Sequence, residues 1–364
     1  MNVSKGLKGV VAAQTALSLV DGENGVLLYR GEHARELALA KSFEEVAYFI
    51  WHETWPNEEE LQDLKKQIKG DRSLPEHIRS ILSSLPLNTS IMSALRTAIS
   101  SLGTDEYGWK PDLGQAITLT AITPTIISYW YRRQKEEKFV EPRDDLDFVA
   151  NYLYMLNGEV PKAAHVRALE AYMILTMEHG FNASTFSARV TVSTESDMIS
   201  AITAAVGTMK GPLHGGAPSG VIEMLEEIGM IENAYQWIED KLTKNERIMG
   251  FGHRVYKTND PRAEALRQIA QQVGEEDEWL ALAHQVEERV IEKLAEWKPG
   301  RKLYTNVEYY AAAVMRALEM EKELFTPTFS ASRMVGWTAH VLEQASDNTI
   351  YRPQAEYTGK VPAL

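Results

Sequence analysis

The chain has 364 residues and a mass of 41.0 kDa, more than one hydrophobic core usually spans, so we expect two domains. A hydrophobic content of 44% and a charged content of 24% exclude disordered and fibrous classes. The formal net charge of −13 argues against a nucleic-acid partner, which needs a basic face. The absence of cysteine excludes disulfides, thiolate zinc sites and cysteine nucleophiles.

Two apolar stretches raise the question of export or membrane insertion. Residues 10–20 follow Lys5 and Lys8, but polar residues interrupt them and no small-x-small cleavage site follows. Residues 113–131 carry no charge, yet their many threonines and Pro124 fit a buried core helix better than a membrane span. We therefore expect no membrane partner and a cytoplasmic location.

In chain order, the first pattern is a small β-hairpin near the N-terminus, with its turn at residues 21–25 between two short apolar runs. From Ser42 onward the pattern is helical, and Ser42 with Glu45 and Asn57 with Glu60 form two capping boxes. Further helices are predicted at 91–102, 113–131, 145–156, 166–177, 197–209, 221–228, 231–242, 263–273, 279–297, 309–318 and 332–344. The fold class is therefore all-α.

Two histidines lie in glycine-rich turns, where no helical or strand period would bury them as core residues. His214 lies in the run Lys-Gly-Pro-Leu-His-Gly-Gly-Ala-Pro, and His253 in Met-Gly-Phe-Gly-His-Arg-Val-Tyr-Lys. A single such histidine is more often a loop or capping residue. Two of them, each with glycines and nearby cations, indicate a functional site.

Other polar residues in turns or at helix ends suggest the kind of substrate. Arg262, Arg333 and Arg352 favour a ligand with several carboxylates, because the planar guanidinium binds them in a bidentate way. No histidine pair has the spacing of a helix-borne metal site, and no G-x-S-x-G motif of a serine hydrolase is present. We expect neither a metal nor a tightly bound cofactor.

Four motifs in fixed order carry a family resemblance. These are the two histidine turns with Asp-Pro-Arg at 260–262, Asn-Val-Glu-Tyr-Tyr at 306–310, and Phe-Ser-Ala-Ser-Arg-Met-Val-Gly-Trp at 329–337. Together they resemble the citrate synthase family, over residues 6 to 359. The resemblance implies an all-α homodimer with a large domain at 1–213 plus 322–364, a small domain at 214–321, and His214 at the hinge.

The family condenses acetyl-CoA with oxaloacetate and hydrolyses the product thioester to citrate and free CoA, a step of the tricarboxylic acid cycle. This makes the expected enzyme class an acyltransferase that converts the acyl group to an alkyl group, with CoA as a cosubstrate. By resemblance, the catalytic residues are His214, His253 and Glu308. The expected oxaloacetate ligands are His179, Arg262, Arg333 and, from the other subunit, Arg352. The expected CoA contacts are Arg247, Ile248, Met249, Gly250, Lys257 and Asn306.

One residue departs from the family pattern, because Glu308 stands where the family normally has aspartate as the base. The extra methylene changes the reach by about 1 Å, a misplacement that can lower a rate roughly 10²-fold. We expect slower turnover, although a compensating backbone shift or another acyl-CoA preference would also fit. Two alternatives stay open: a 2-methylcitrate synthase that uses propionyl-CoA, and a non-catalytic sensor of dicarboxylate and CoA.

Overall fold

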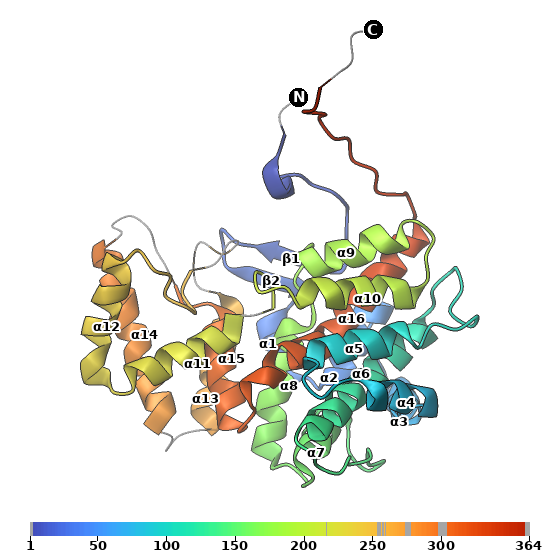
Figure 1. Cartoon of the computed structure of the whole chain (residues 1–364), viewed down its shortest axis with the longest axis horizontal. Coiled ribbons are helices and arrows are strands. Elements are labelled where there is room, and N and C mark those ends of the chain that lie inside the picture. Colours follow the sequence, from blue (N-terminus) through green and yellow to red (C-terminus); the bar gives the residue numbers. More distant parts are fainter. Residues whose placement is uncertain are drawn as a thin grey trace.

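The computed structural model of the chain describes residues 3–215, 217–252, 256, 258, 260–273, 278–297 and 304–360. The described residues are predominantly helical, with one small sheet, as Figure 1 shows. The expected all-α class is confirmed. The two-domain division at 1–213 plus 322–364 and 214–321 stays a prediction.

The N-terminal sheet has three antiparallel strands, β1 (Ser18–Asp21), β2 (Val26–Tyr29) and β3 (Glu32–His33), preceded by the short 3-10 helix η1 (Lys5–Leu7). The predicted hairpin is present, with Ser18 opposite Tyr29. The third strand was not predicted, because two residues are too few to show an alternating pattern. It follows a two-residue turn in which Arg30 and Gly31 both have positive φ, the geometry that suits a tight hairpin.

Ten helices follow the sheet and precede the first histidine turn. They are α1 (Ala34–Ala40), α2 (Phe43–His52), α3 (Glu58–Asp71), α4 (Glu76–Ser84), α5 (Ile91–Ser100), α6 (Leu113–Gln134), α7 (Phe148–Asn157), α8 (Ala163–Met177), α9 (Ala183–Val192) and α10 (Met198–Met209). Both predicted capping boxes are present, at the start of α2 and at the start of α3. Helix α9 was not predicted, because its Ser, Thr and Val residues have weak helix propensity; the Asn182 side chain nevertheless caps it.

The remaining helices follow the first histidine turn and carry Arg262, Glu308 and Arg333. They are α11 (Ala217–Ile228), α12 (Ile231–Thr243), α13 (Pro261–Val273), α14 (Glu278–Trp297), α15 (Val307–Ala317), the 3-10 helix η2 (Lys322–Leu324) and α16 (Phe325–Ser346). In Figure 1, α11, α12 and α14 lie to the left of the body formed by α1–α10. Helices α13 and α15 pack against α8 and so join the two groups.

The core is organised around α16, which packs against α2, α5, α6, α8 and α9. This helix begins earlier than predicted, because Pro327 falls in its first turn, where proline is tolerated. It also ends two residues later than predicted. Helix α6 contains the charge-free stretch and is largely buried, including Pro124 and three threonines. Among the described helices, none is long and apolar enough to cross a membrane.

Candidate active site

The turn between α8 and α9 carries His179. The His179 Nε2 atom lies 3.2 Å from the hydroxyl oxygen of Tyr256, and the two rings meet edge to face. The next residue, Gly180, has φ +59°, and a Cβ there would lie 3.0 Å from a methyl group of Val20. The turn therefore needs a glycine to place His179 close to the N-terminal sheet.

Arg262 lies at the start of α13 and is buried. Asp260 accepts from the Arg262 backbone N–H and Nε at 3.0 Å and from Nη2 at 2.8 Å. Burial alone would lower the pKa of Arg262, but the charge and hydrogen bonding of Asp260, together with the charges of Tyr256 and Glu308, leave that pKa above its usual value. Asp260 also accepts from the backbone N–H of Val307 at 3.1 Å, which joins α13 to the start of α15.

Glu308 lies in the first turn of α15. The helix is capped by Asn306, whose side-chain oxygen accepts from the Glu308 backbone N–H at 3.1 Å. The Oε2 atom of Glu308 is buried and has no hydrogen-bond partner in the described part of the chain. Burial raises the pKa of Glu308 above its usual value, opposed by the charge of Arg262. The site thus holds a carboxylate that is more basic than one in water.

His214 lies in the turn before α11, close to the N-terminus of that helix, as the sequence indicated. Its Nε2 atom is 2.7 Å from the Ser184 hydroxyl, which also accepts from Trp337 Nε1 at 2.9 Å. Burial, assisted by the charge of Arg333, lowers the pKa of His214 to about 4. The imidazole is therefore neutral at physiological pH.

Arg333, in the middle of α16, is 1% exposed. Its Nε donates to the Thr176 carbonyl oxygen at 2.7 Å, and its guanidinium lies over the Phe329 ring. Its two terminal nitrogens donate to no side chain that the structure describes. These donors are thus available to a ligand.

The buried Tyr172 shows that these groups converge. Burial raises its pKa, and the charges of Glu308, Arg333 and Arg262 all act on it as well. Three charged groups, from α13, α15 and α16, therefore lie near the same buried tyrosine, and Arg333 also acts on His214. The structure brings together His179, His214, Arg262, Glu308 and Arg333.

The predicted CoA-binding residues are partly described. Arg247 is exposed, Ile248 is buried, and Met249 packs beside Gly220. Gly250 has φ +83°, and a Cβ there would lie 2.7 Å from Tyr309. Asn306 binds this turn, donating from its backbone N–H to Gly250 and from its side chain to Gly252. Two predicted site residues, His253 and Lys257, lie outside the described residues.

Arg352 does not join the other arginines within one chain. It is exposed and lies on the extended segment that follows α16. In Figure 1 this segment rises away from the body, beside the N-terminal segment. Within this chain Arg352 therefore lies apart from the other predicted oxaloacetate ligands.

The structure adds residues whose part the sequence did not reveal. Ser184 and Trp337 hold His214, Tyr256 lies between His179 and Arg262, and Glu178 lies beside Arg333. Glu178 stands next to a predicted residue, and Tyr256 and Trp337 lie inside predicted motifs, yet none of the four residues carries a signal of its own. Within the described residues, no group of histidine, aspartate and glutamate side chains is arranged to hold a metal ion.

Comparison with known proteins decides the family. The family described as "Citrate synthase, C-terminal domain" matches residues 6–354. The chain belongs to the citrate synthase family. The expected enzyme class, an acyltransferase, is confirmed by this membership. A relative named citrate synthase 2, from Bacillus subtilis, is 43% identical and covers 99% of this chain and 96% of its own length.

Two further relatives bear on the substrate. The 2-methylcitrate synthase of Mycobacterium tuberculosis is 39% identical, and the alignment covers 98% of this chain and 91% of that protein. The citrate synthase of Thermoplasma acidophilum, solved as a ternary complex with carboxymethyl coenzyme A and oxaloacetate, superposes with a TM-score of 0.92 at 27% identity. That match covers 100% of this chain and 98% of the solved one.

Proposed function

We propose that this citrate synthase family member condenses acetyl-CoA with oxaloacetate and then hydrolyses the thioester to citrate and CoA. The observation that carries the proposal is the convergence of a basic carboxylate, a neutral imidazole and two guanidinium groups in one buried place. Proton removal next to a thioester needs the first two groups, and binding a dicarboxylate needs the others.

Glu308 is the proposed base for the thioester methyl group. A carboxylate with an ordinary pKa of about 4.3 is a weak base for this proton. Burial raises the pKa of Glu308, and its Oε2 atom accepts no hydrogen bond from the described residues, which leaves it free to accept a proton. The raised pKa makes this carboxylate a stronger base for the proton of the thioester methyl group.

His214 is the proposed donor to the enolate oxygen. The Ser184 hydroxyl has one proton and two acceptors in reach, His214 Nε2 and Asn182 Oδ1. Asn182 Oδ1 also accepts from the Thr185 backbone N–H at 3.1 Å, and in this proposal the Ser184 proton is assigned to His214. The neutral imidazole then carries its proton on Nδ1 and can donate it to a hydrogen bond with the enolate.

Arg262, Arg333 and His179 are the proposed ligands of oxaloacetate, with His253 as the acid that polarises its ketone. Arg262 is held by Asp260, whereas Arg333 keeps its terminal donors open for a carboxylate. The T. acidophilum relative was solved with oxaloacetate and a CoA analogue, and we infer the same two kinds of ligand here. We also infer CoA contacts from Arg247 to Gly250, Lys257 and Asn306.

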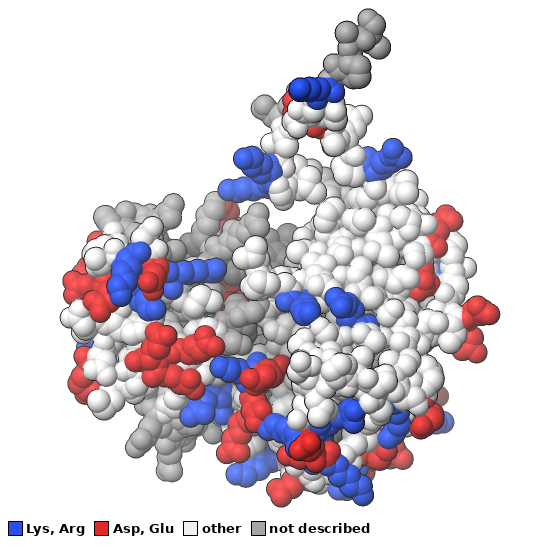
Figure 2. All heavy atoms as spheres, in the orientation of Figure 1, with Lys and Arg blue, Asp and Glu red and all other residues white. Residues whose placement is uncertain are grey.

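A homodimer is part of the proposal, with Arg352 reaching the partner's site. Figure 2 shows few charged side chains over α5, α9 and α10. The half-buried face of α10 carries small uncharged residues, Thr203, Ala204, Gly207 and Thr208, which allow close helix packing. Dimers mixed from His253→Ala and Arg352→Ala chains should regain activity if Arg352 acts across the interface; activity no higher than in either parent would contradict it.

We further propose the domain division stated above, with the His214 turn as the hinge. Thr326, in the first turn of α16, donates to the carbonyl oxygen of Gly215 at 2.7 Å and so anchors the turn on one side. Closure over oxaloacetate would exclude water and complete the CoA site, which protects the thioester. We propose that the enzyme acts in the cytoplasm.

The test is the release of free thiol from acetyl-CoA and from propionyl-CoA, each with and without oxaloacetate. We expect oxaloacetate-dependent release that is faster with acetyl-CoA. Faster release from propionyl-CoA would favour the 2-methylcitrate synthase reaction, for which a relative at 39% identity is the supporting observation. One methylene is worth only about 1–3 kcal/mol of discrimination. Oxaloacetate binding without thiol release from either thioester would identify a sensor and contradict the proposal.

A further inference from the structure

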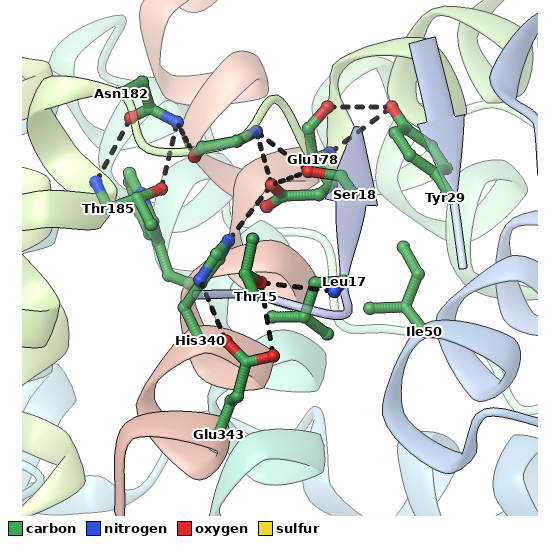
Figure 3. A network of polar contacts seen from close by, with 12 residues as sticks. Thr15, Leu17, Ser18, Tyr29, Ile50, Glu178, Asn182, Thr185, His340 and Glu343 are labelled. Atoms are coloured by element: carbon green, nitrogen blue, oxygen red, sulfur yellow. Dashed lines mark hydrogen bonds and ion pairs between the residues drawn. The ribbon is translucent and has the colours of Figure 1, made fainter. Parts of the chain in front are cut away.

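A buried polar network around Glu178 and His340 contacts the turn that carries His179 through Gly180, and the proposed chemical steps do not use Glu178 or His340 (Figure 3). Its centre is Glu178, which is fully buried at the end of α8. His340 of α16 lies 3.1 Å from one carboxylate oxygen of Glu178 and 3.0 Å from Arg189 Nη1 of α9. The network therefore links three helices that meet at the proposed oxaloacetate site.

The direction of these hydrogen bonds follows from Arg189. A guanidinium has only donors, so it must donate to His340 Nδ1, and the proton of a neutral imidazole is then on Nε2. His340 thus donates to Glu178. The same Oε1 atom of Glu178 also accepts from the Ser18 hydroxyl at 2.9 Å and from the Gly180 backbone N–H at 2.5 Å. Three donors hold this oxygen, and one of them belongs to the turn that presents His179.

Glu178 also faces Arg333 without pairing with it directly. The two side chains meet beside Gly336, where a Cβ would lie 2.6 Å from Glu178 Oε2 and 3.4 Å from Arg333 Cδ. No ion pair joins the two, yet each charge acts on the other. The three donors on Oε1 hold the carboxylate in place, which leaves the terminal donors of Arg333 open.

We propose that Glu178 is a positioning residue for oxaloacetate, which fixes the His179 turn through Gly180 and supplies the counter-charge of Arg333 without occupying its donors. The inference rests on the proposed function, because it names oxaloacetate as the ligand of these groups. Glu178 acts through His179 and Arg333 and does not touch the substrate.

The test is the Kd for oxaloacetate of Glu178→Gln, measured by titration calorimetry. Glutamine keeps the size and one acceptor oxygen but removes the charge. Its NH2 group replaces Oε2, which has no hydrogen-bond partner among the described residues. A neutral acceptor holds the Gly180 N–H less firmly and a buried donor is left unpaired, so we expect the Kd to rise about tenfold. The KM for acetyl-CoA should stay within about twofold, which general unfolding would not produce.

A matched control is Glu44→Gln, since Glu44 is also a buried carboxylate that accepts a backbone N–H, that of Phe148. Its Kd for oxaloacetate should equal that of the wild type. If Glu178→Gln does not fold, Ser18→Ala is the second variant, because Ser18 is only partly buried and contacts both Glu178 and Gly180. It should raise the Kd about threefold.

The outcomes separate the two proposals. A wild-type chain that binds oxaloacetate, with a Kd unchanged or lowered in Glu178→Gln, overturns the inference and leaves the proposed function standing. An equal loss in Glu44→Gln also overturns it. A wild-type chain that does not bind oxaloacetate overturns both, and Ser18→Ala with an unchanged Kd overturns the inference when Glu178→Gln is unfolded.

Discussion

The two buried arginines of the site, Arg262 and Arg333, are held in different ways. The counter-charge of Arg262 is Asp260, two residues earlier, in a direct ion pair at 2.8 Å. The counter-charge of Arg333 is Glu178, from another helix, and no direct pair joins them. The charge of Arg262 is therefore balanced by a residue of the same local motif, whereas the charge of Arg333 is balanced only because α16 packs against α8. The difference teaches that a substrate-binding arginine can be stabilised either by pairing or by a charge held at a distance.

The largest expected effect on turnover comes from Glu308, the proposed base. It lies beside Val307, whose backbone N–H binds Asp260, the partner of Arg262. Glu308→Gln removes the proton acceptor and keeps the shape of the side chain. We expect kcat for thiol release to fall by at least about 10³-fold, within the range for loss of a general base. The Kd for oxaloacetate, measured by calorimetry, should stay near that of the wild type. Retained turnover would show that another group removes the proton.

Asp260→Asn tests the pairing itself. It removes the negative charge paired with a buried arginine. Breaking such a pair typically costs about 3–5 kcal/mol, so the free energy of unfolding from urea titration should fall by about that amount. Asp240→Asn, on the exposed face of α12, is the control and should change it by less than about 0.5 kcal/mol. Because Glu178 makes no direct pair with Arg333, Glu178→Gln should cost less than Asp260→Asn. A larger loss of stability in Glu178→Gln than in Asp260→Asn would contradict the proposed difference between the two arginines.

Glu44 is a buried carboxylate with no arginine paired to it. Burial raises its pKa from 4.5 to about 7, so folding favours its protonated form. Its stabilising contribution is complete below a pH of about 4.5 and is lost as the pH rises through about 7. Glu44→Gln should therefore be more stable than the wild type by roughly 1–3 kcal/mol at a pH of about 8 and nearly equal at about 5. A pH-independent difference in urea unfolding would contradict this.

Much of the fold was predictable because its signals are local. The Ser42–Glu45 and Asn57–Glu60 boxes mark helix starts through contacts three residues apart, and both are present. The charge-free stretch around Pro124 was correctly interpreted as a core helix. Helix α9 and strand β3 were missed, since one consists of weak helix formers and the other is two residues long. Helix α9 packs against α10 and the distant α16, whereas β3 pairs with the neighbouring β2.

The sequence by itself determined the family, the helical class and the residues of the proposed site, because these reside in contiguous motifs such as Asp-Pro-Arg and Asn-Val-Glu. Only the tertiary structure decided the electrostatic state of those residues. The low pKa of His214 and the raised pKa of Glu308 come from burial, and Arg333 is balanced by Glu178 from 155 positions earlier in the chain. Burial and charge act through space, so residue order alone does not set them.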